Sequence, residues 1–378
     1  MIGVMKDNLK RCLLLWVLSI VSLAVWSQNI RMAVLLPLKE ESNRGATLMD
    51  FYRGLLMAVE RVKTEGVSVS VRTVDCGTSA AQMQETLKDG KLDQMDMIIG
   101  PLDGEQVPLL SDFCSQHRIR MILPFNTPCP QIHDNSYIYQ LGIAQEQLFP
   151  EVAALVIHTF SNSRFIFCNT GDADSRTQNF CEYLERAVQT NNMQSIRFRV
   201  PTEDVDYASV LSPAQTNVIV LDSRNRETVE RTLRGIKAFQ QHSPQFKVAL
   251  LGYPEWVRYA PSLQRDYNAC DTYIYTTYFR NPLSGRVLTF EQQFQKNFNK
   301  RPVDSYPRAE LLGYDLGYYF LHGLATLGTD FDERQGTLEQ LPLQHKFNFQ
   351  RVNEQGGFIN HHTQLIHYAP NNTITVIQ

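Results

Sequence analysis

The chain has 378 residues, a formal net charge of −3 and a hydrophobic content of 43%. A chain of this length buries about three quarters of its unfolded surface, more than one hydrophobic core usually accommodates, so we expect two lobes. The mild acidity, with no basic stripe among aromatic residues, argues against nucleic acid as a partner.

The N-terminal segment has the pattern of an export signal. Basic side chains precede an apolar run over residues 12–26, and the small residue Ser27 follows. This pattern predicts a cleaved signal peptide over residues 1–27 and a periplasmic mature chain that begins at Gln28. The alternative is a membrane anchor, but the run is shorter than the roughly 20 apolar residues of a spanning helix.

Strands and helices alternate in the first third of the mature chain. Apolar periodicity predicts strands over 31–36, 67–71, 95–99 and 119–123, and helices over 46–63, 79–88 and 104–117. Such a βαβ series indicates a parallel sheet with right-handed crossovers.

A second series of the same kind follows. It predicts strands over 164–168, 196–200, 217–221 and 246–251, and helices over 175–189, 204–211 and 225–241. Two successive series favour an α/β fold with two Rossmann-like, doubly wound lobes, and the length disfavours the alternative of one large sheet.

The remaining sequence does not simply extend the second series. It predicts a strand over 271–279, helices over 288–299 and 309–327, and terminal strands within 345–350, 363–369 and 373–378. This order suggests a chain that passes between the lobes more than once.

Sequence motifs of catalysis are missing. The chain has no GxSxG elbow, P-loop, HExxH or paired CxxC, and no GxGxxG follows the first strand. We therefore assign no catalytic residue, no metal and no cofactor, and expect a protein that is not an enzyme. His361, His362 and His367 are weak metal candidates, because adjacent residues of a strand point to opposite faces. In "TGDADSR" we favour Asp174 or Ser175 as a helix cap over a calcium loop.

Polar or turn-forming residues follow nearly every predicted strand. The stretches are "PLDGEQ", "PFNTP", "NTGDADS", "DSRN" and "GYPEW". In open α/β sheets, ligands bind outside the carboxyl ends of the strands, so two lobes whose carboxyl edges face each other would form a cleft. Asp103 is a candidate ligand contact, and the alternative is a helix cap that Asp103 makes with Gln106. Asp222 and Tyr253 are candidates by their position at strand ends.

Several stretches in this order resemble the type I periplasmic binding-protein superfamily, especially its leucine/isoleucine/valine-binding branch. They are "IRMAVLLPL", "GATLMDFYRGLLMAVE", "IIGPLDGEQV", "RIRMILPFNT", "VDYASVL" before "NVIVLD", and "FQKNFNKRPVDSYPRAELLGYDLGYYFLHGL". The resemblance implies two lobes that close by hinge bending, joined by three crossing strands. The implied crossings lie near 141–144, 276–279 and 328–336. The implied division is lobe I over 28–142 and 279–330, and lobe II over 143–278 and 331–378.

The resemblance also implies ligand contacts, with departures from the family pattern. Gly104 stands where the family offers a serine hydroxyl to an amino-acid carboxylate. In the next loop, Asn126 and Thr127 belong to the binding segment and Thr127 matches the family threonine, whereas Phe125 replaces a small residue and would fill part of the pocket. Ser175-Arg176 stands at the family's Tyr-Gly, so amino-acid specificity is not carried over.

Two functions follow as hypotheses. The first is an exported solute-binding receptor that closes on a small polar ligand, amino-acid-like or derived from the cell envelope, and hands it to a membrane transporter or sensor. The alternative arises because "AVLLPL" and "GPLDGEQVPLL" also resemble the binding-protein-like domain of lipoproteins that activate penicillin-binding proteins. That relative implies an envelope interaction protein that regulates a peptidoglycan synthase, with a cleft that binds no solute.

Overall fold

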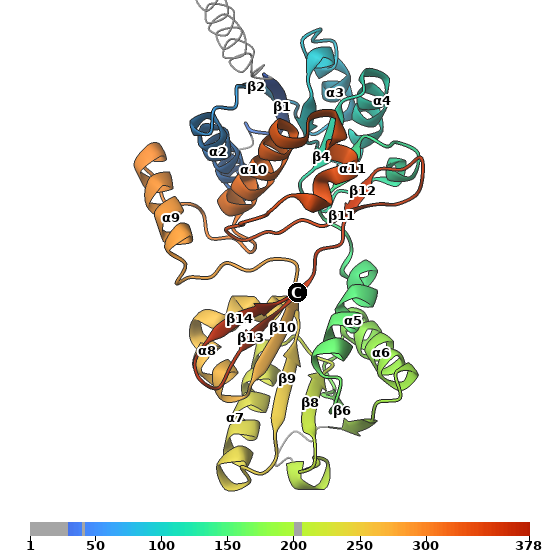
Figure 1. Ribbon diagram of the computed structural model, residues 1–378, viewed down its shortest axis with the longest axis vertical. Helices are drawn as coiled ribbons and strands as arrows, with labels where there is room; N and C mark the ends of the chain where they lie inside the picture. Colours follow the sequence, from blue (N-terminus) through green and yellow to red (C-terminus); the bar gives the residue numbers. More distant parts are fainter. Residues whose placement is uncertain (1–28, 40–41, 200–205) are drawn as a thin grey trace, which may run out of the picture.

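The computed structural model describes residues 29–39, 42–199 and 206–378, which form two α/β lobes (Figure 1). The predicted signal peptide over residues 1–27 lies outside the described residues. In the described part of the chain, each lobe contains a seven-stranded sheet with helices packed against it. The predicted fold class is therefore confirmed.

The sheet of lobe I is parallel except at one edge. Its strands are β1 (Ile30–Leu36), β2 (Val69–Asp75), β3 (Met97–Ile99), β4 (Arg120–Leu123), β5 (Ile138–Gln140), β11 (Phe349–Arg351) and β12 (Phe358–Asn360). The order across the sheet is β11-β12-β5-β4-β3-β1-β2, and β11 alone runs antiparallel to its neighbour. Both faces of β1 are buried, as is typical of a strand between two helical layers.

Helices cover both faces of this sheet. α2 (Asn43–Thr64) and α10 (Ala309–Leu327) pack on one face, and α3 (Ala80–Thr86) and α4 (Val107–His117) on the other. α2 and α10 approach so closely that a Cβ at Gly54 would lie 2.0 Å from the Glu310 carbonyl oxygen. Glycine is therefore required where these two helices cross.

Lobe II repeats this architecture. Its strands are β6 (Ser163–Asn169), β7 (Ser195–Arg199), β8 (Thr216–Leu221), β9 (Val248–Gly252), β10 (Thr272–Thr276), β13 (Gln364–Tyr368) and β14 (Ile374–Ile377), in the order β14-β13-β10-β9-β8-β6-β7. Its helices are α5 (Phe149–Thr159), α6 (Ser175–Thr190), α7 (Arg226–His242) and α8 (Ala260–Ala269). β13 and β14 are antiparallel to their neighbours, whereas the other pairs are parallel.

The remaining helices are short or lie beside lobe I. α9 (Gly285–Phe298) and α11 (Phe331–Arg334) belong to this group (Figure 1). The 3-10 helices are η1 (Leu92–Gln94), η2 (Pro130–His133), η3 (Gln145–Leu148), η4 (Tyr207–Ser209), η5 (Pro254–Tyr259), η6 (Gly328–Asp330) and η7 (Gln335–Thr337). Within the described residues, every helix is too short or too polar to cross a membrane.

Three segments pass between the two sheets, at 141–144, 277–284 and 361–363. The expected third crossing near 328–336 is wrong, and so is the placement in lobe II of the two strands that follow it. Phe331 is buried in the core of lobe I, and Asp332 pairs with Arg120 of β4 at 2.7 Å. These contacts keep the chain on lobe I until β12 has paired with β5.

Candidate functional site

The topology turns the carboxyl edges of the two parallel sheets toward each other. β5 ends at Gln140 and the chain then enters lobe II, so the carboxyl ends of β1, β3 and β4 also point toward lobe II. β10 ends at Thr276 and the chain then enters lobe I, so the carboxyl ends of β6, β8 and β9 point toward lobe I. The loops after these strands form the candidate site, because this edge is where such sheets bind ligands.

The lobe I wall begins at the turn after β3. Gly100 has a φ of 122°, and a Cβ there would lie 2.0 Å from the Leu35 carbonyl oxygen, so only glycine fits. The next residues leave the sheet and form a loop before α4 begins at Val107. In this loop Gly104 is exposed and has open space around its Cβ position.

Asp103 does not cap α4, contrary to the alternative weighed from the sequence. No side-chain hydrogen bond caps this helix, and the Gln106 amide donates instead to the Cys76 carbonyl oxygen at 3.0 Å. One carboxylate oxygen of Asp103 lies 3.5 Å from Arg44, and the other is buried with no hydrogen-bond partner among the described residues. A buried acceptor without a donor costs free energy, so Asp103 is left with capacity to bind a ligand donor.

The loop after β4 supports the Asp103 loop. The Thr127 hydroxyl donates to the Leu102 carbonyl oxygen at 2.9 Å, and only 3% of Thr127 is exposed. The ring of Phe125 lies 5.1 Å from that of Phe51 and packs against the lobe I core. Asn126 is exposed beside the first crossing segment. Thr127 therefore holds two loops together, and Asn126 is the member of this segment that faces solvent.

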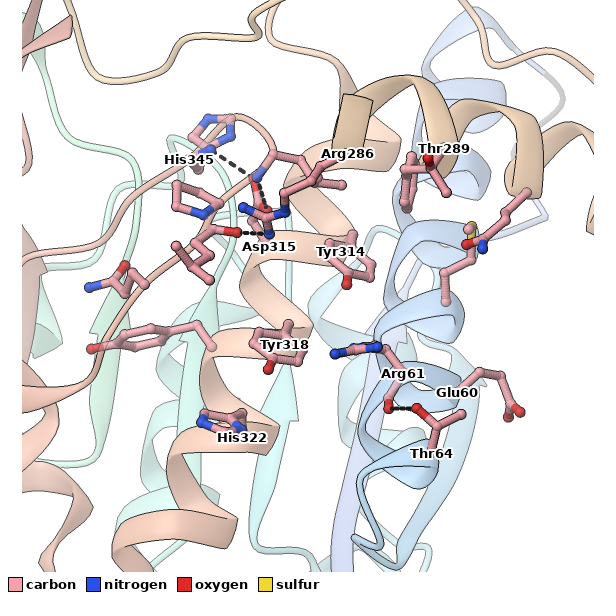
Figure 2. Close-up of a pocket in the computed structure, with 18 of the residues that line it drawn as sticks. Glu60, Arg61, Thr64, Arg286, Thr289, Tyr314, Asp315, Tyr318, His322 and His345 are labelled. Atoms are coloured by element: carbon pink, nitrogen blue, oxygen red, sulfur yellow. Dashed lines mark hydrogen bonds between the residues drawn. The ribbon is translucent and has the colours of Figure 1, made fainter. Parts of the chain in front are cut away.

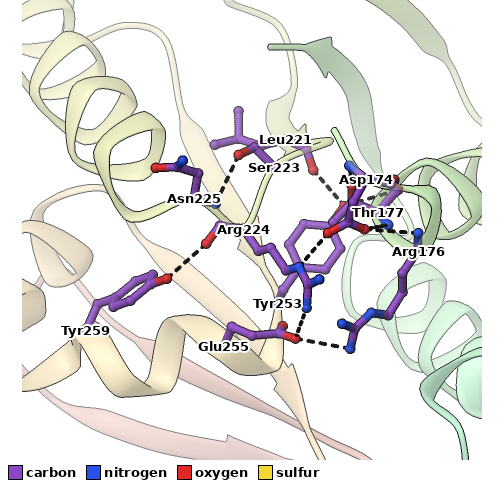
Figure 3. Close-up of polar contacts among 10 residues, drawn as sticks. All are labelled: Asp174, Arg176, Thr177, Leu221, Ser223, Arg224, Asn225, Tyr253, Glu255 and Tyr259. Carbon is purple, nitrogen blue, oxygen red and sulfur yellow. Dashed lines mark hydrogen bonds and ion pairs between the residues drawn. The ribbon is translucent and has the colours of Figure 1, made fainter. Parts of the chain in front are cut away.

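The lobe II wall carries a network of charged residues from three loops (Figure 3). Arg224, after β8, donates from Nε to Asp174 at 2.6 Å and from Nη1 to Glu255 at 2.8 Å. Arg176 reaches the same Glu255 oxygen at 3.1 Å. Figure 3 shows Arg224 between the two carboxylates, with Arg176 approaching Glu255 from α6. These contacts fix the loops after β6, β8 and β9 relative to one another.

Asp174 also caps α6. Its Oδ1 accepts from the backbone N–H groups of Arg176 and Thr177, both at 3.0 Å, which confirms the predicted cap. Partial burial raises the pKa of Asp174, but the Thr177 N–H and the Arg224 guanidinium outweigh it, and the pKa lies below its usual value. The carboxylate is thus held in the charged form that its partners require.

Among the described residues, the buried polar atoms of lobe II that lack a hydrogen-bond partner include two that bear on the site. One is Oε2 of Glu255, and the other is the hydroxyl of Tyr275 near the carboxyl end of β10. Burial raises the pKa of Tyr275 well above its usual value, so the hydroxyl keeps its proton and can donate. The edge of lobe II therefore holds an acceptor and a donor with unused hydrogen-bonding capacity, close to the loops that carry Arg176 and Arg224.

Asp222 and Tyr253 make hydrogen bonds within lobe II. Asp222 accepts from the Thr170 backbone N–H at 2.8 Å and from its hydroxyl at 2.5 Å, which joins the loops after β6 and β8. Tyr253 is 1% exposed, and its hydroxyl donates to the Leu221 carbonyl oxygen at 2.7 Å. Tyr253 is therefore a core residue, and its contact with a ligand stays a prediction.

Two of the stretches predicted to line the cleft also hold Arg224 and Glu255, which the sequence patterns did not single out as ligand contacts. Arg224 lies two residues after Asp222, and Glu255 two residues after Tyr253. Arg224 lies just before α7 and Glu255 lies within η5, so both stand where the chain has left the sheet and enters the next helix. A search for oppositely charged residues at this offset would have found Arg224 and Glu255.

The histidines do not form a metal site. His361 pairs with Glu151 at 2.7 Å and His367 with Asp271 at 2.6 Å, whereas His362 is buried in the third crossing segment. Among the described residues, no cluster of three or more His, Cys, Asp or Glu side chains could hold a metal ion.

Comparison with known proteins finds likeness in structure. No protein-family model matches the sequence, and no curated protein matches it. A solved structure from Rhodospirillum rubrum, assigned to branched-chain amino acid ABC transport, matches with a TM-score of 0.59 at 12% identity and covers 92% of this chain and 100% of its own.

Two further solved structures match in the same way. A branched chain amino acid ABC transporter periplasmic ligand-binding protein from Burkholderia xenovorans LB400 has a TM-score of 0.51 at 15% identity and covers 93% of this chain and 95% of its own. An ABC transporter substrate-binding protein from Sphaerobacter thermophilus has a TM-score of 0.50 at 15% identity and covers 93% of this chain and 96% of its own. Over nearly its whole length, the chain has the fold of the type I periplasmic binding proteins.

Proposed function

We propose that this protein is a non-enzymatic, exported receptor that binds a small polar solute between its two lobes. The observation that carries the proposal is a pair of buried carboxylate oxygens, Oδ2 of Asp103 and Oε2 of Glu255, which have no hydrogen-bond partner in the part of the chain that the structure describes. They lie on loops at the two facing sheet edges, one in each lobe. A solute that donates to both would satisfy two acceptors that the protein leaves unpaired.

The groups around these oxygens define the chemistry of the solute. Arg44 stands beside Asp103, and Arg176 beside Glu255, with the free Tyr275 hydroxyl at the same edge. A ligand with both donors and acceptors, such as an amino-acid-like compound or a fragment of the cell envelope, fits such mixed walls. Asn126 and Gly104 are exposed on lobe I, and we propose that they contact the same ligand.

In this proposal the two lobes close when the solute binds. A ligand that touches Asp103 and Glu255 at once contacts both walls only when the lobes approach, so binding shifts the population toward a closed form. The three crossing segments are the hinge in this proposal. The signal-like N-terminus supports a periplasmic location, and the titles of the matching structures support delivery to a membrane transporter.

The test is thermal unfolding of the mature chain, residues 28–378, with panels of amino acids, short peptides, sugars and cell-wall fragments. A solute at 100 times its Kd stabilises the folded state by about 2.7 kcal/mol and raises Tm. Asp103→Asn and Glu255→Gln should each weaken the response at least tenfold. Glu227→Gln, at an exposed position on α7, is the matched control. No response to any solute at millimolar concentration would contradict the proposal.

The alternative function makes a different prediction. An envelope interaction protein would show no solute response and would retain a peptidoglycan synthase when the mature chain is incubated with envelope extract. That pair of results would replace the receptor proposal with the interaction role.

A further inference from the structure

A cavity of about 820 Å³ lies in lobe I, outside the facing sheet edges (Figure 2). Its walls are α2, α9, α10 and the segment 338–347. The volume falls within the range of about 300–1,000 Å³ that is common for small-molecule sites. No residue of the candidate site between the lobes lines this cavity.

The cavity exists because α9 packs against lobe I along only part of its surface. Phe290 and Phe294 form a small apolar cluster with Met57 of α2 and Leu311 of α10. The neighbouring stripe of α9 faces the open space with polar side chains, which are Arg286, Thr289, Gln293 and Asn297. Their spacing of three and four residues places them on one side of the helix.

The opposite wall is an ordered row of rings on α10. Tyr314, Tyr318 and His322 follow each other at intervals of four residues, and each neighbouring pair of rings is 9° from parallel. The Tyr318 hydroxyl donates to Glu65 at 3.1 Å, and Arg61 pairs with the same carboxylate at 2.9 Å. These contacts hold the row in place without a ligand.

Arg286 supplies a cation on the cavity wall, and its charge acts on Asp315, whose pKa it lowers. It donates to the Leu341 carbonyl oxygen, and among the described residues it forms no ion pair within 4.0 Å. Asp315 also faces Arg286 in Figure 2, but both Asp315 oxygens accept backbone N–H groups from residues 343–345. The guanidinium therefore has donors free for an anion from solution.

Tyr314 stands next to this cation. Burial raises the pKa of Tyr314 to about 12, while the charges of Arg61 and Arg286 oppose that shift. The Tyr314 hydroxyl therefore keeps its proton and can donate, and Tyr314 lines the same cavity as Arg61 and Arg286. Figure 2 shows Arg61 directed toward α10, whereas the Glu60 side chain extends away from it.

Apolar side chains complete the lining. They are Met57, Phe290, Leu338, Leu341, Leu343 and Phe347. Leu341 is 63% exposed at the rim of the cavity. A ligand with an apolar body would cover this surface while a charged group reached Arg286.

We propose that this cavity is a second binding site, which takes a small organic acid with its carboxylate on Arg286 and Tyr314 and its apolar body against Leu341 and Phe290. The site acts independently of the site between the lobes. It is suited to an acid of aromatic or short aliphatic type, because one anion anchor stands beside one apolar surface.

The test is calorimetric titration of the mature chain with 4-phenylbutyrate, and with the uncharged 4-phenylbutan-1-ol as the matched probe. Binding of the acid should saturate at one per chain, and the alcohol should bind at least tenfold more weakly. Arg286→Ala should weaken acid binding at least tenfold. Arg265→Ala, an exposed arginine on α8, is the control and should change nothing.

Two further variants keep the result unambiguous. Thr289→Trp fills the cavity from α9, leaves Arg286 in place and should also abolish binding. Glu255→Gln should have no effect, because Glu255 lies in the other lobe, so loss of binding in that variant would place the acid between the lobes and overturn the proposal. Equal affinity for acid and alcohol, unchanged affinity in Arg286→Ala, or no saturable binding up to 10 mM would each overturn it as well.

Discussion

Arg224 donates to Glu255 at 2.8 Å, and this contact joins the loop after β8 to the loop after β9. About a third of the Arg224 side chain and a fifth of the Glu255 side chain are exposed. Solvent therefore screens the pair, and we expect a coupling free energy of about 0.2–1 kcal/mol from a double-mutant cycle with Arg224→Ala and Glu255→Ala. Urea unfolding at low and high salt measures it, and the coupling should shrink as salt rises. The more exposed Arg186–Glu182 pair of α6 is the control, and a salt-independent coupling above 2 kcal/mol would contradict the expectation.

Gly54 and Gly104 should respond differently to the same substitution. A Cβ at Gly54 would strike the Glu310 backbone at 2.0 Å, whereas a Cβ at Gly104 meets nothing within 4 Å. Gly54→Ala should therefore force α2 and α10 apart and lower the free energy of unfolding by more than 3 kcal/mol. Gly104→Ala should change it by less than about 0.5 kcal/mol. Chemical denaturation of both variants measures the difference, and a mild effect at Gly54 would show that the two helices can separate at little cost.

The long elements of this fold were predictable from the sequence because each buries a regular apolar stripe. The predicted helix over 309–327 coincides with α10, and the predicted strand over 217–221 lies within β8. Shorter elements such as β5 and β12, each of three residues, show too little periodicity to identify. The predicted helix over 204–211 lies partly outside the described residues, and over 206–211 the structure has only η4, a single 3-10 turn.

Long-range pairing was the part that local patterns could not predict. β12 joins the lobe I sheet by pairing with β5, more than two hundred residues earlier. Nothing in the local pattern of β12 distinguishes this partner from a strand of lobe II. The site shows the same limit, because the turn geometry that buries Tyr253 and brings Glu255 to Arg224 depends on packing around η5.

Tyr253→Phe tests the assignment of this residue to the core. The hydroxyl donates to the Leu221 carbonyl oxygen at 2.7 Å inside lobe II, so its removal leaves one buried acceptor unpaired. We expect a loss of about 1 kcal/mol in the free energy of unfolding. The response to any solute found in the thermal screen should be unchanged. A tenfold loss of that response without loss of stability would return Tyr253 to the ligand site.

Asp315 links α10 to the segment before the third crossing. Its carboxylate accepts the backbone N–H groups of Leu343, Gln344 and His345 at 2.7–2.8 Å. Burial raises the pKa of Asp315 from 3.8 to about 7, while these three N–H groups oppose the shift. Between those pH values the folded state holds a proton that the unfolded state has released. Stability from this group therefore falls as pH rises from about 4 to about 7 and is constant above.

Asp315→Asn isolates that dependence. The amide has one acceptor oxygen in place of two, so the variant should be less stable than the wild type by about 1–3 kcal/mol. The difference in the free energy of unfolding between wild type and variant should become smaller from pH 4 to pH 7. Urea unfolding across that range measures it. A difference that grows would show that the three N–H donors hold the pKa of Asp315 below its unfolded value.

His345 and His362 have the opposite effect on acid stability. His345 stacks on Tyr278 beside the second crossing, and His362 lies in the third crossing. Burial lowers the pKa of His345 to about 3 and that of His362 to about 4, from 6.5. Below pH 6.5 these two histidines are therefore protonated in the unfolded chain but still neutral in the folded chain. The free energy of unfolding falls as pH falls from 6.5 toward 4.

His362→Gln should remove one of these two groups. The slope of the free energy of unfolding against pH should then be smaller by about 1.4 kcal/mol per pH unit between pH 4.5 and 6. His158→Gln, at an exposed position on α5, is the control for loss of a surface histidine. An unchanged slope in His362→Gln would mean that His362 takes up its proton in the folded state and that the third crossing opens to water near neutral pH.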